Sequence, residues 1–343
     1  MGPADDRGAL GKGVLVSTML AVTAPPHGGP ETLTHSRRDR PNPGPHQVLV
    51  RVEAIGVNRA DAMQRAGTYA PPPGESDILG LELTGEVIAL GPDAHRFREG
   101  ERIFGLVAAG AYAEYAVVDE RIAVRVPEGW DAVRAAAVIE TFCTANETLF
   151  TLGRLAAGER VLIHAAGSGV GSTGIQMARH VGAEVVTTAG SEEKLRRALA
   201  LGAAHAINYK NQDFAQVIAA LDPPGVDLVE DFVGASYLQR HLAVLRPLGR
   251  MVSVGLLGPT EATIDPRPIL YKRLTLMGFT LRPQTIAEKE AIVGRFVERW
   301  MKPLQERQVE AVIHAVLPFT QVAEAHRMME AGENFGKIVL TVP

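Results

Sequence analysis

Hydrophobic and polar positions follow two different patterns along the chain. In residues 19–142, short apolar or alternating runs are separated by turn residues, which is typical of a β-rich region. Prolines clustered within residues 41–45 and 71–73 predict loops. The expected strands cover residues 19–23, 47–54, 81–90 and 113–118, and the helical patterns cover residues 58–65 and 131–148.

From Arg160 onwards, strand-like and helix-like segments alternate, which predicts an open parallel sheet with helices on both faces. The expected strands are 161–163, 184–189, 206–209, 227–231, 251–255 and 274–280, with helices from Ser172 and over 192–201, 214–221 and 236–245. A helix over 286–301 ending before Pro303, a strand over 311–317, a helix over 321–331 and a strand over 337–342 close the chain. We therefore expect an α/β protein in which a doubly wound domain (143–282) is inserted between two parts of a β-rich domain (19–142 and 283–343).

The turn after the strand at residues 161–163 is rich in glycine. Such a turn, leading straight into a helix, presents unpaired backbone N–H groups and the positive end of the helix dipole, which suits a phosphate. Residues 169–174 fit G-x-G-x-x-G, and a second register places Ala166, Ser168 and Gly171 at the three small positions. The pattern alone also describes an ordinary glycine-rich turn. The following strand at 184–189 completes a βαβ unit and favours a dinucleotide site.

Composition excludes several classes of protein. The 343 residues are 46% hydrophobic and 22% charged with a net charge of −4, which indicates a globular protein of two domains with no reason to bind nucleic acid. The basic run at residues 37–40 is expected to be a solvated loop. A single cysteine, Cys143, excludes an intramolecular disulfide and a multi-cysteine zinc site, and we expect it to be a buried thiol.

The N-terminal segment needs a separate decision. Residues 14–22 are apolar and faintly resemble a signal peptide, but Asp5 and Asp6 interrupt the basic leader that such a peptide needs. We expect residues 1–18 to be a disordered extension before the first strand. No run is long enough to span a bilayer, and a cytoplasmic location is expected.

Short motifs spread over nearly the whole chain from Met19 match one known superfamily. They lie at residues 19–22, 28–31, 58–61, 67–74, 78–82, 163–171, 188–191, 201–203, 208–210, 255–256 and 336–340. With these motifs the chain resembles the medium-chain dehydrogenase/reductase superfamily and, within it, the zinc-independent NADPH:quinone oxidoreductases. The resemblance implies a GroES-like catalytic domain, a Rossmann domain, and homodimers joined along the edge of the Rossmann sheet.

The sequence departs from the zinc-dependent members of that superfamily. Those members place a cysteine where Asn58 stands and Gly-His-Glu where Gly80, Leu81 and Glu82 stand. Asparagine and leucine do not supply the thiolate and imidazole that a catalytic zinc requires. His164, at a strand end, is expected to be packed rather than a ligand. We therefore expect no metal, and without a Lewis acid alcohol oxidation is disfavoured.

The predicted adenosine pocket favours NADPH. NAD-binding versions of this fold carry an acid at the end of the second strand, whereas this chain has Ala189, Gly190 and Ser191 there. By resemblance, Ser191, Lys194 and Tyr209 hold the 2′-phosphate; the alternative is a capping serine, a solvated lysine and a core-edge tyrosine. By the same resemblance, the other cofactor-binding residues are Thr144 at the nicotinamide carboxamide, the turn Ser168, Gly169, Val170 and Gly171, and the cleft residues Gly255, Leu256, Asn334 and Lys337.

The resemblance also implies three residues of the substrate pocket. Asn58 would hydrogen-bond a carbonyl oxygen, and Tyr69 would orient or protonate it, unless Tyr69 is only a packing aromatic. Asp61 is a catalytic candidate or, equally, a helix cap. The expected function is NADPH-dependent reduction of a quinone without a metal. The alternatives are a zinc-free 2-alkenal or enoyl reductase, or a crystallin-like protein that binds NADPH without turnover.

Overall fold

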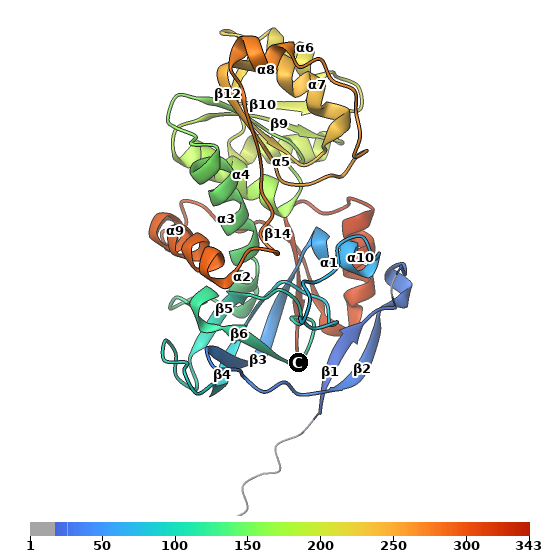
Figure 1. The fold of residues 1–343 in the computed structure, drawn as a ribbon, viewed down its shortest axis with the longest axis vertical. Helices are drawn as coiled ribbons and strands as arrows, with labels where there is room; N and C mark the ends of the chain where they lie inside the picture. Colours follow the sequence, from blue (N-terminus) through green and yellow to red (C-terminus); the bar gives the residue numbers. More distant parts are fainter. Residues whose placement is uncertain (1–17, 26) are drawn as a thin grey trace, which may run out of the picture.

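The computed structural model describes residues 18–25 and 27–343, and these form two parts, one built on a parallel sheet and one β-rich (Figure 1). The predicted extension at residues 1–18 lies outside the described residues, except that Thr18 already begins strand β1 (Thr18–Thr23). No helix in the described part of the chain combines the length and the apolar character needed to cross a membrane.

The β-rich part is built from both ends of the chain. Its main sheet has the order β14-β15-β3-β4-β5-β7, with β6 paired to β3. The strands are β3 (Gln47–Val57), β4 (Glu82–Leu90), β5 (Arg102–Leu106), β6 (Tyr115–Asp119), β7 (Ala123–Arg125), β14 (Ile313–Pro318) and β15 (Lys337–Thr341). Strands β14 and β15 come from the last 31 residues, so the sheet closes only after the other part of the molecule has been traversed.

A separate two-stranded ribbon pairs β1 with β2 (Thr34–Asp39) in antiparallel register. The expectation that the basic run at residues 37–40 is a loop was wrong for residues 37–39. Strand β2 has no apolar alternation because both of its faces are largely polar, so its pattern carries no hydrophobic signal. Strand β2 is an edge strand, paired through its backbone to β1 only, and edge strands commonly carry charged side chains.

The helices of the β-rich part and the connection to the next domain differ from the prediction in one respect. Helices α1 (Arg59–Arg65) and α10 (Val322–Glu330) lie side by side, blue and red in Figure 1. The single helix expected over 131–148 is instead α2 (Ala132–Ala136), α3 (Ile139–Ala145) and a π-helical segment (Asn146–Leu152). The break has a physical cause, because α2 packs on β3 and β4 whereas α3 packs chiefly on the helix at residues 169–180 of the other part.

The second part is a six-stranded sheet of order β10-β9-β8-β11-β12-β13, with every neighbouring pair parallel, as predicted. Its strands are β8 (Arg160–Ile163), β9 (Glu184–Ala189), β10 (His205–Asn208), β11 (Val226–Asp231), β12 (Leu245–Ser253) and β13 (Thr275–Gly278). Its helices are α4 (Gly169–His180), α5 (Glu192–Leu201), α6 (Phe214–Ala219), α7 (Ala235–Val244) and α8 (Arg267–Lys272).

Capping residues predicted the ends of one helix correctly, whereas a proline predicted the end of another helix wrongly. Helix α5 begins and ends where predicted, because the Ser191 side chain caps it and Gly202 ends it at φ 109°. Helix α9 (Ile286–Gln305) runs through Pro303 instead of ending before it. Pro303 removes one backbone hydrogen bond of the last turn, and the buried side chains of Trp300 and Leu304 hold that turn on the core.

Candidate active site

The glycine turn between β8 and α4 has the geometry of an anion site. The Ser168 hydroxyl caps α4 by accepting a hydrogen bond from the Gly171 N–H at 2.8 Å, so the helix begins at Gly169 rather than at Ser172 as expected. A Cβ on Gly171 would lie 2.3 Å from the Ala165 carbonyl oxygen, which explains why only glycine fits. Among the described residues, no acceptor meets the N–H groups of Gly169 and Val170, which leaves them for a ligand.

A C-terminal loop from the β-rich part closes over this turn. The Gly336 N–H donates to the Gly167 carbonyl at 2.9 Å, and the Asn334 side chain donates to the Gly336 carbonyl at 2.8 Å. The Lys337 stem passes so close to Gly169 that a Cβ there would lie 2.9 Å from Lys337 Cδ. The predicted cleft residues Asn334 and Lys337 are therefore brought to the glycine turn.

The predicted phosphate corner gathers positive charge. Ser191 caps α5, and the hydroxyl of Tyr209 lies 2.5 Å from where a Cβ on Gly190 would stand. The Lys194 amine bonds the Gly332 carbonyl of the β-rich part. Burial lowers the Lys194 pKa, and the cations Arg197, Arg59 and Lys210 lower it further, against an opposing effect of Glu193. The end of β9 carries no acid, and three cations together with Glu193 act on Lys194.

The remaining predicted cofactor residues lie on the same two parts without hydrogen bonds to the turn. Thr144 is buried on α3, one turn after Thr141, whose methyl group would lie 2.9 Å from a Cβ on Gly169. Gly255 and Leu256 follow β12, and the Leu256 side chain is 56% exposed next to Gly234. These positions flank the cleft from the side of the parallel sheet.

A buried ion pair joins Lys337 to Glu82 beside Asn58, two of the positions where the resemblance would put zinc ligands. The Lys337 ammonium donates to Glu82 Oε1 at 2.6 Å, to Asn58 Oδ1 at 2.7 Å and to the Val57 carbonyl at 2.9 Å. The Lys337 side chain is 3% exposed and that of Glu82 is fully buried. Glu82 Oε2 accepts from the Glu140 N–H at 3.0 Å. All three protons of the ammonium are therefore used inside the protein.

These residues do not fit a zinc ion. Tetrahedral zinc needs several thiolate, imidazole or carboxylate ligands, and Asn58 and Leu81 provide neither sulfur nor imidazole nitrogen. The one carboxylate, Glu82, is already neutralised by an ammonium at hydrogen-bond distance. Within residues 18–25 and 27–343, no group of three or more His, Cys, Asp or Glu residues has the geometry to hold a metal.

Two of the predicted catalytic residues are held by the protein itself. Asn58 donates both amide protons, to the Gly56 carbonyl at 3.2 Å and to Glu82 at 2.9 Å, so donation to a substrate requires one of them to be displaced. Asp61 is fully buried and accepts from the Asn58 N–H at 2.8 Å and from the Tyr112 hydroxyl at 3.0 Å. Burial raises its pKa to about 6. These contacts are those of a helix cap, the structural alternative expected for Asp61.

Tyr69, the third predicted catalytic residue, is positioned by an arginine that the sequence did not single out. Arg282 donates to the Tyr69 carbonyl at 3.0 Å, to the Ala108 carbonyl at 2.7 Å and to the Gln64 side chain. Its guanidinium lies 5.2 Å from the centroid of the Tyr69 ring. No described residue bonds the Tyr69 hydroxyl, and burial raises the Tyr69 pKa. The tyrosine is thus a neutral, half-buried donor with its loop held to the end of the parallel sheet.

Glu140, in the first turn of α3, was also missed. Burial, followed by the nearby charge of Glu82, raises its pKa to about 8, so this carboxyl carries a proton at pH 7. Where Glu140 is ionised, its charge raises the Tyr69 pKa further, so the two groups lie within electrostatic range of one another. The signal that could have found it is a single acid inside the otherwise apolar helical run VIETFC at residues 138–143.

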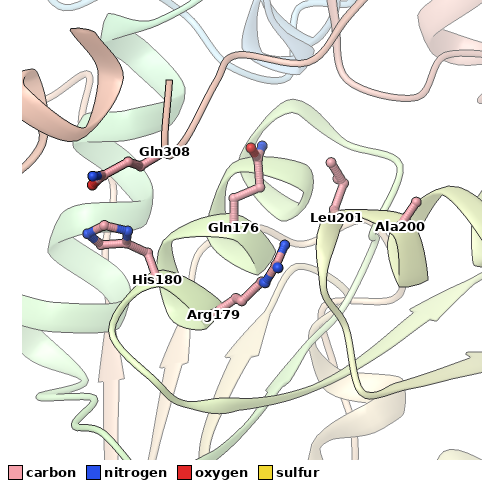
Figure 2. A pocket seen from close by; sticks show the side chains of 6 residues that line it. All are labelled: Gln176, Arg179, His180, Ala200, Leu201 and Gln308. Carbon is pink, nitrogen blue, oxygen red and sulfur yellow. The ribbon is translucent and has the colours of Figure 1, made fainter. Parts of the chain in front are cut away.

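A hollow elsewhere on the parallel-sheet part is distinct from this cleft. It has a volume of about 320 Å³ and lies between the C-terminal ends of α4 and α5 (Figure 2). The Gln176 side chain already bonds the backbone of Glu310 at 2.8 and 3.1 Å. Arg179 and His180 are exposed. Because α4 is about 18 Å long, this hollow lies well away from the glycine turn at its other end.

Known proteins resemble the chain along nearly its full length. The family described as alcohol dehydrogenase GroES-like domain matches residues 44–128, and that described as zinc-binding dehydrogenase matches residues 169–327. The chain is 33% identical over 330 residues to the quinone oxidoreductase of Homo sapiens, with 94% of this chain and 97% of the relative covered. The Escherichia coli quinone oxidoreductase complexed with NADPH superposes with a TM-score of 0.84 at 25% identity, covering 94% and 99% of the two chains. The CurK enoyl reductase has a TM-score of 0.84 at 27% identity, covering 95% and 99%.

Proposed function

Because the chain belongs to the medium-chain dehydrogenase/reductase superfamily, we propose that it reduces quinones with NADPH as the electron donor and without a bound metal. The family makes the protein an NADPH-dependent oxidoreductase. The choice of a quinone and the absence of a metal go beyond the family. The observation that carries them is the ammonium of Lys337, bonded to Glu82 and Asn58 at the position of the zinc ligands.

The residues present fit NADPH. The N–H groups at the start of α4 suit a pyrophosphate, and by the resemblance we assign Ser191, Lys194 and Tyr209 to the 2′-phosphate. By the same resemblance we assign the buried residues Thr144 and Asn334 to the nicotinamide end. When bound, this cofactor supplies a hydride, and the chain contributes alignment and exclusion of water.

The proposed acceptor is chosen from two features of the site, the absence of a Lewis acid and the presence of proton donors. Without a Lewis acid the alkoxide formed in alcohol oxidation is poorly stabilised, and the ammonium of Lys337 has no proton to spare for that oxygen. A quinone is already electrophilic and needs only a hydrogen-bond donor and a proton for the reduced oxygen. We propose the Tyr69 hydroxyl and the Glu140 carboxyl, both with pKa values raised by burial, as the carriers of that proton.

A second candidate acceptor is a conjugated carbonyl such as a 2-alkenal or an enoyl thioester. It is favoured by the similarity to the CurK enoyl reductase, and the same two proton carriers would serve the carbon or oxygen of an enolate. A crystallin-like protein that binds NADPH without turnover is not proposed, since the family is one of oxidoreductases.

The test combines metal analysis with an acceptor survey. The purified protein should contain less than about one zinc per ten chains, and its rate should be unchanged after dialysis against a chelator. NADPH oxidation at 340 nm should be faster with 1,4-benzoquinone or 9,10-phenanthrenequinone than with 2-hexenal. Stoichiometric zinc, or a rate that the chelator abolishes, would refute the metal-free proposal. A higher kcat/KM for the alkenal would replace the quinone by the second candidate.

The assembly and location expected from the sequence remain predictions. Strand β13 forms one edge of the parallel sheet, and Leu276 on it is 39% exposed. Just before it, Leu270 and Tyr271 on α8 are 71% and 77% exposed. An open strand edge with apolar side chains beside it supports the proposed homodimer. The cytoplasmic location rests on the sequence alone.

A further inference from the structure

A chain of buried polar side chains leads to Asp61 through the β-rich part. It consists of Arg65 on α1, His326 on α10 and Tyr112 in the loop before β6, and neither they nor Asp61 are more than 3% exposed. The Arg65 guanidinium lies 3.0 Å from His326 Nδ1. The Tyr112 hydroxyl lies 3.1 Å from His326 Nε2 and donates to Asp61 Oδ2 at 3.0 Å. Buried polar groups of this kind are unfavourable unless they are hydrogen-bonded to one another.

The direction of every hydrogen bond in this chain is fixed from the arginine end. A guanidinium has donors only, so Arg65 donates and His326 Nδ1 accepts. The neutral imidazole then carries its one proton on Nε2 and donates it to the Tyr112 oxygen. The single hydroxyl proton of Tyr112 goes to Asp61 Oδ2. The chain therefore ends with a donor held against one carboxylate oxygen of Asp61.

The same groups are unsuited to carrying protons. Burial, followed by the charges of Arg65 and Arg59, lowers the His326 pKa to about 3, so the ring is neutral at physiological pH. Burial raises the Tyr112 pKa well above its ordinary value. Proton transfer along the chain would have to begin with a proton taken from Arg65, and an arginine does not give one up in proteins. The chain orients Asp61 rather than supplying it with protons.

Asp61 passes this constraint to Asn58, the residue assigned to the acceptor. Its Oδ2 also accepts from the Asn58 N–H at 2.8 Å, while Oδ1 has no partner among the described residues. The turn at Asn58 is thereby fixed, and the Asn58 side chain bonds Glu82. The Tyr112 ring constrains the same place from the other side. A Cβ on Gly80, two residues before Glu82, would lie 2.4 Å from Tyr112 Cδ1.

We propose that Arg65, His326 and Tyr112 are positioning residues of the reduction, because their one-directional chain of hydrogen bonds fixes Asp61 and, through it, the Asn58 amide at the acceptor. This role rests on the proposed function, since it concerns the site assigned to the acceptor. The hydrogen bonds themselves can be tested without turnover.

Removal of the last donor tests the chain directly. Tyr112→Phe keeps the ring that packs on Gly80 and removes the hydroxyl. The Asp61 pKa, about 6 in the wild type, should rise because a hydrogen bond that stabilises the charged carboxylate is lost. The carboxyl carbon-13 resonance of Asp61, identified by its absence in Asp61→Asn, measures this pKa in a pH titration of the full chain.

Other charged groups act on the same carboxylate but are left in place. Lys337 of β15 and Arg282 favour its charge, and Glu82 of β4 opposes it. The matched control is Tyr115→Phe, because Tyr115 presents its ring face to the Arg40 guanidinium, 4.5 Å from the centroid. This control should leave the Asp61 titration as it is in the wild type.

Turnover with the acceptor that the wild type reduces fastest tests the positioning role. Tyr112→Phe and His326→Leu should each lower kcat/KM for that acceptor about 10-fold, the effect of losing one hydrogen bond. The Kd for NADPH, from fluorescence titration, should be unchanged. His326→Gln should recover part of the loss, because its amide offers one acceptor to Arg65 and one donor to Tyr112. Thermal melting of each variant establishes that the folded protein is being measured.

Three results would overturn the proposal. An Asp61 pKa that is the same in Tyr112→Phe and wild type would remove the chain. Equal losses in His326→Leu and His326→Gln would contradict its direction. Unchanged kcat/KM in both Tyr112→Phe and His326→Leu, beside an active wild type, would remove its role in positioning. A wild type that reduces neither quinones nor alkenals would instead refute the proposed function, and the Asp61 titration would still report on the chain.

Discussion

The buried pair between Lys337 and Glu82 makes the sharpest prediction about stability. Lys337→Met keeps the unbranched stem that packs beside Gly169 but removes the ammonium. Glu82 then remains as a fully buried carboxylate with only the donors from Asn58 and the Glu140 backbone. The Val57 carbonyl and Asn58 Oδ1 each lose one donor as well.

The expected cost is set by the charge left without a partner. Removing one member of a buried pair destabilises a protein by about 3–5 kcal/mol. For a part of this size, such a loss corresponds to a fall in melting temperature of about 10 °C. The measurement is the free energy of unfolding from urea titration without NADPH, with Lys302→Met as the exposed control, which should lie within about 0.5 kcal/mol of the wild type.

The matched pair of variants separates the ion pair from general damage. Glu82→Gln alone leaves an unpaired buried ammonium and should also be destabilised. Combining it with Lys337→Met removes both charges, so the double variant should be more stable than the sum of the two single losses by at least about 2 kcal/mol. The reasoning is refuted if Lys337→Met costs less than about 1 kcal/mol, or if the two losses simply add.

Three other parts of the structure make predictions of the same kind. Lys194→Glu should lower kcat/KM for NADPH about 10- to 100-fold and leave NADH unaffected, because it reverses a charge at the phosphate corner; equal kcat/KM for the two cofactors in the wild type would contradict this. Burial raises the Glu230 pKa to about 8. Between pH 4.5 and 8 the folded protein therefore holds a proton that the unfolded chain has released. The free energy of unfolding falls as pH rises through that window, by up to about 1.4 kcal/mol per pH unit. Urea titrations of Glu230→Gln should show a shallower fall than the wild type, and an identical pH profile would disprove the assignment. Leu276→Glu should convert the proposed dimer to a monomer in light scattering at unchanged melting temperature, whereas a monomeric wild type would remove the basis for it.

Local sequence was sufficient where the signal and its cause lie within a few residues. The bounds of α5 followed from Ser191 and Gly202, because a side-chain cap and a left-handed glycine act on their own turn. The glycine turn, the six parallel strands and the missing acid after β9 were predicted for the same reason. Prediction from local sequence failed where neighbouring segments pack against different parts of the molecule. The single helix expected over 131–148 is divided for this reason.

For the candidate site, too, some features were predictable from the sequence and others depended on the fold. The residue types at Asn58, Leu81 and Cys143 were enough to predict that zinc ligands are missing, because a metal site depends on which donor atoms exist at all. That the Lys337 ammonium bonds Glu82 was decided by the fold alone, since the two residues are 255 positions apart.

Glu140 and Arg282 were missed because nothing in their neighbouring residues indicates a role. A carboxyl acquires a raised pKa, and an arginine acquires buried partners, only when distant segments remove it from water. The sequence by itself thus determined the architecture, the cofactor turn and the donor atoms present. Tertiary packing decided which of those atoms are buried, paired or left free, because burial and pairing depend on contacts between segments that are far apart in the chain.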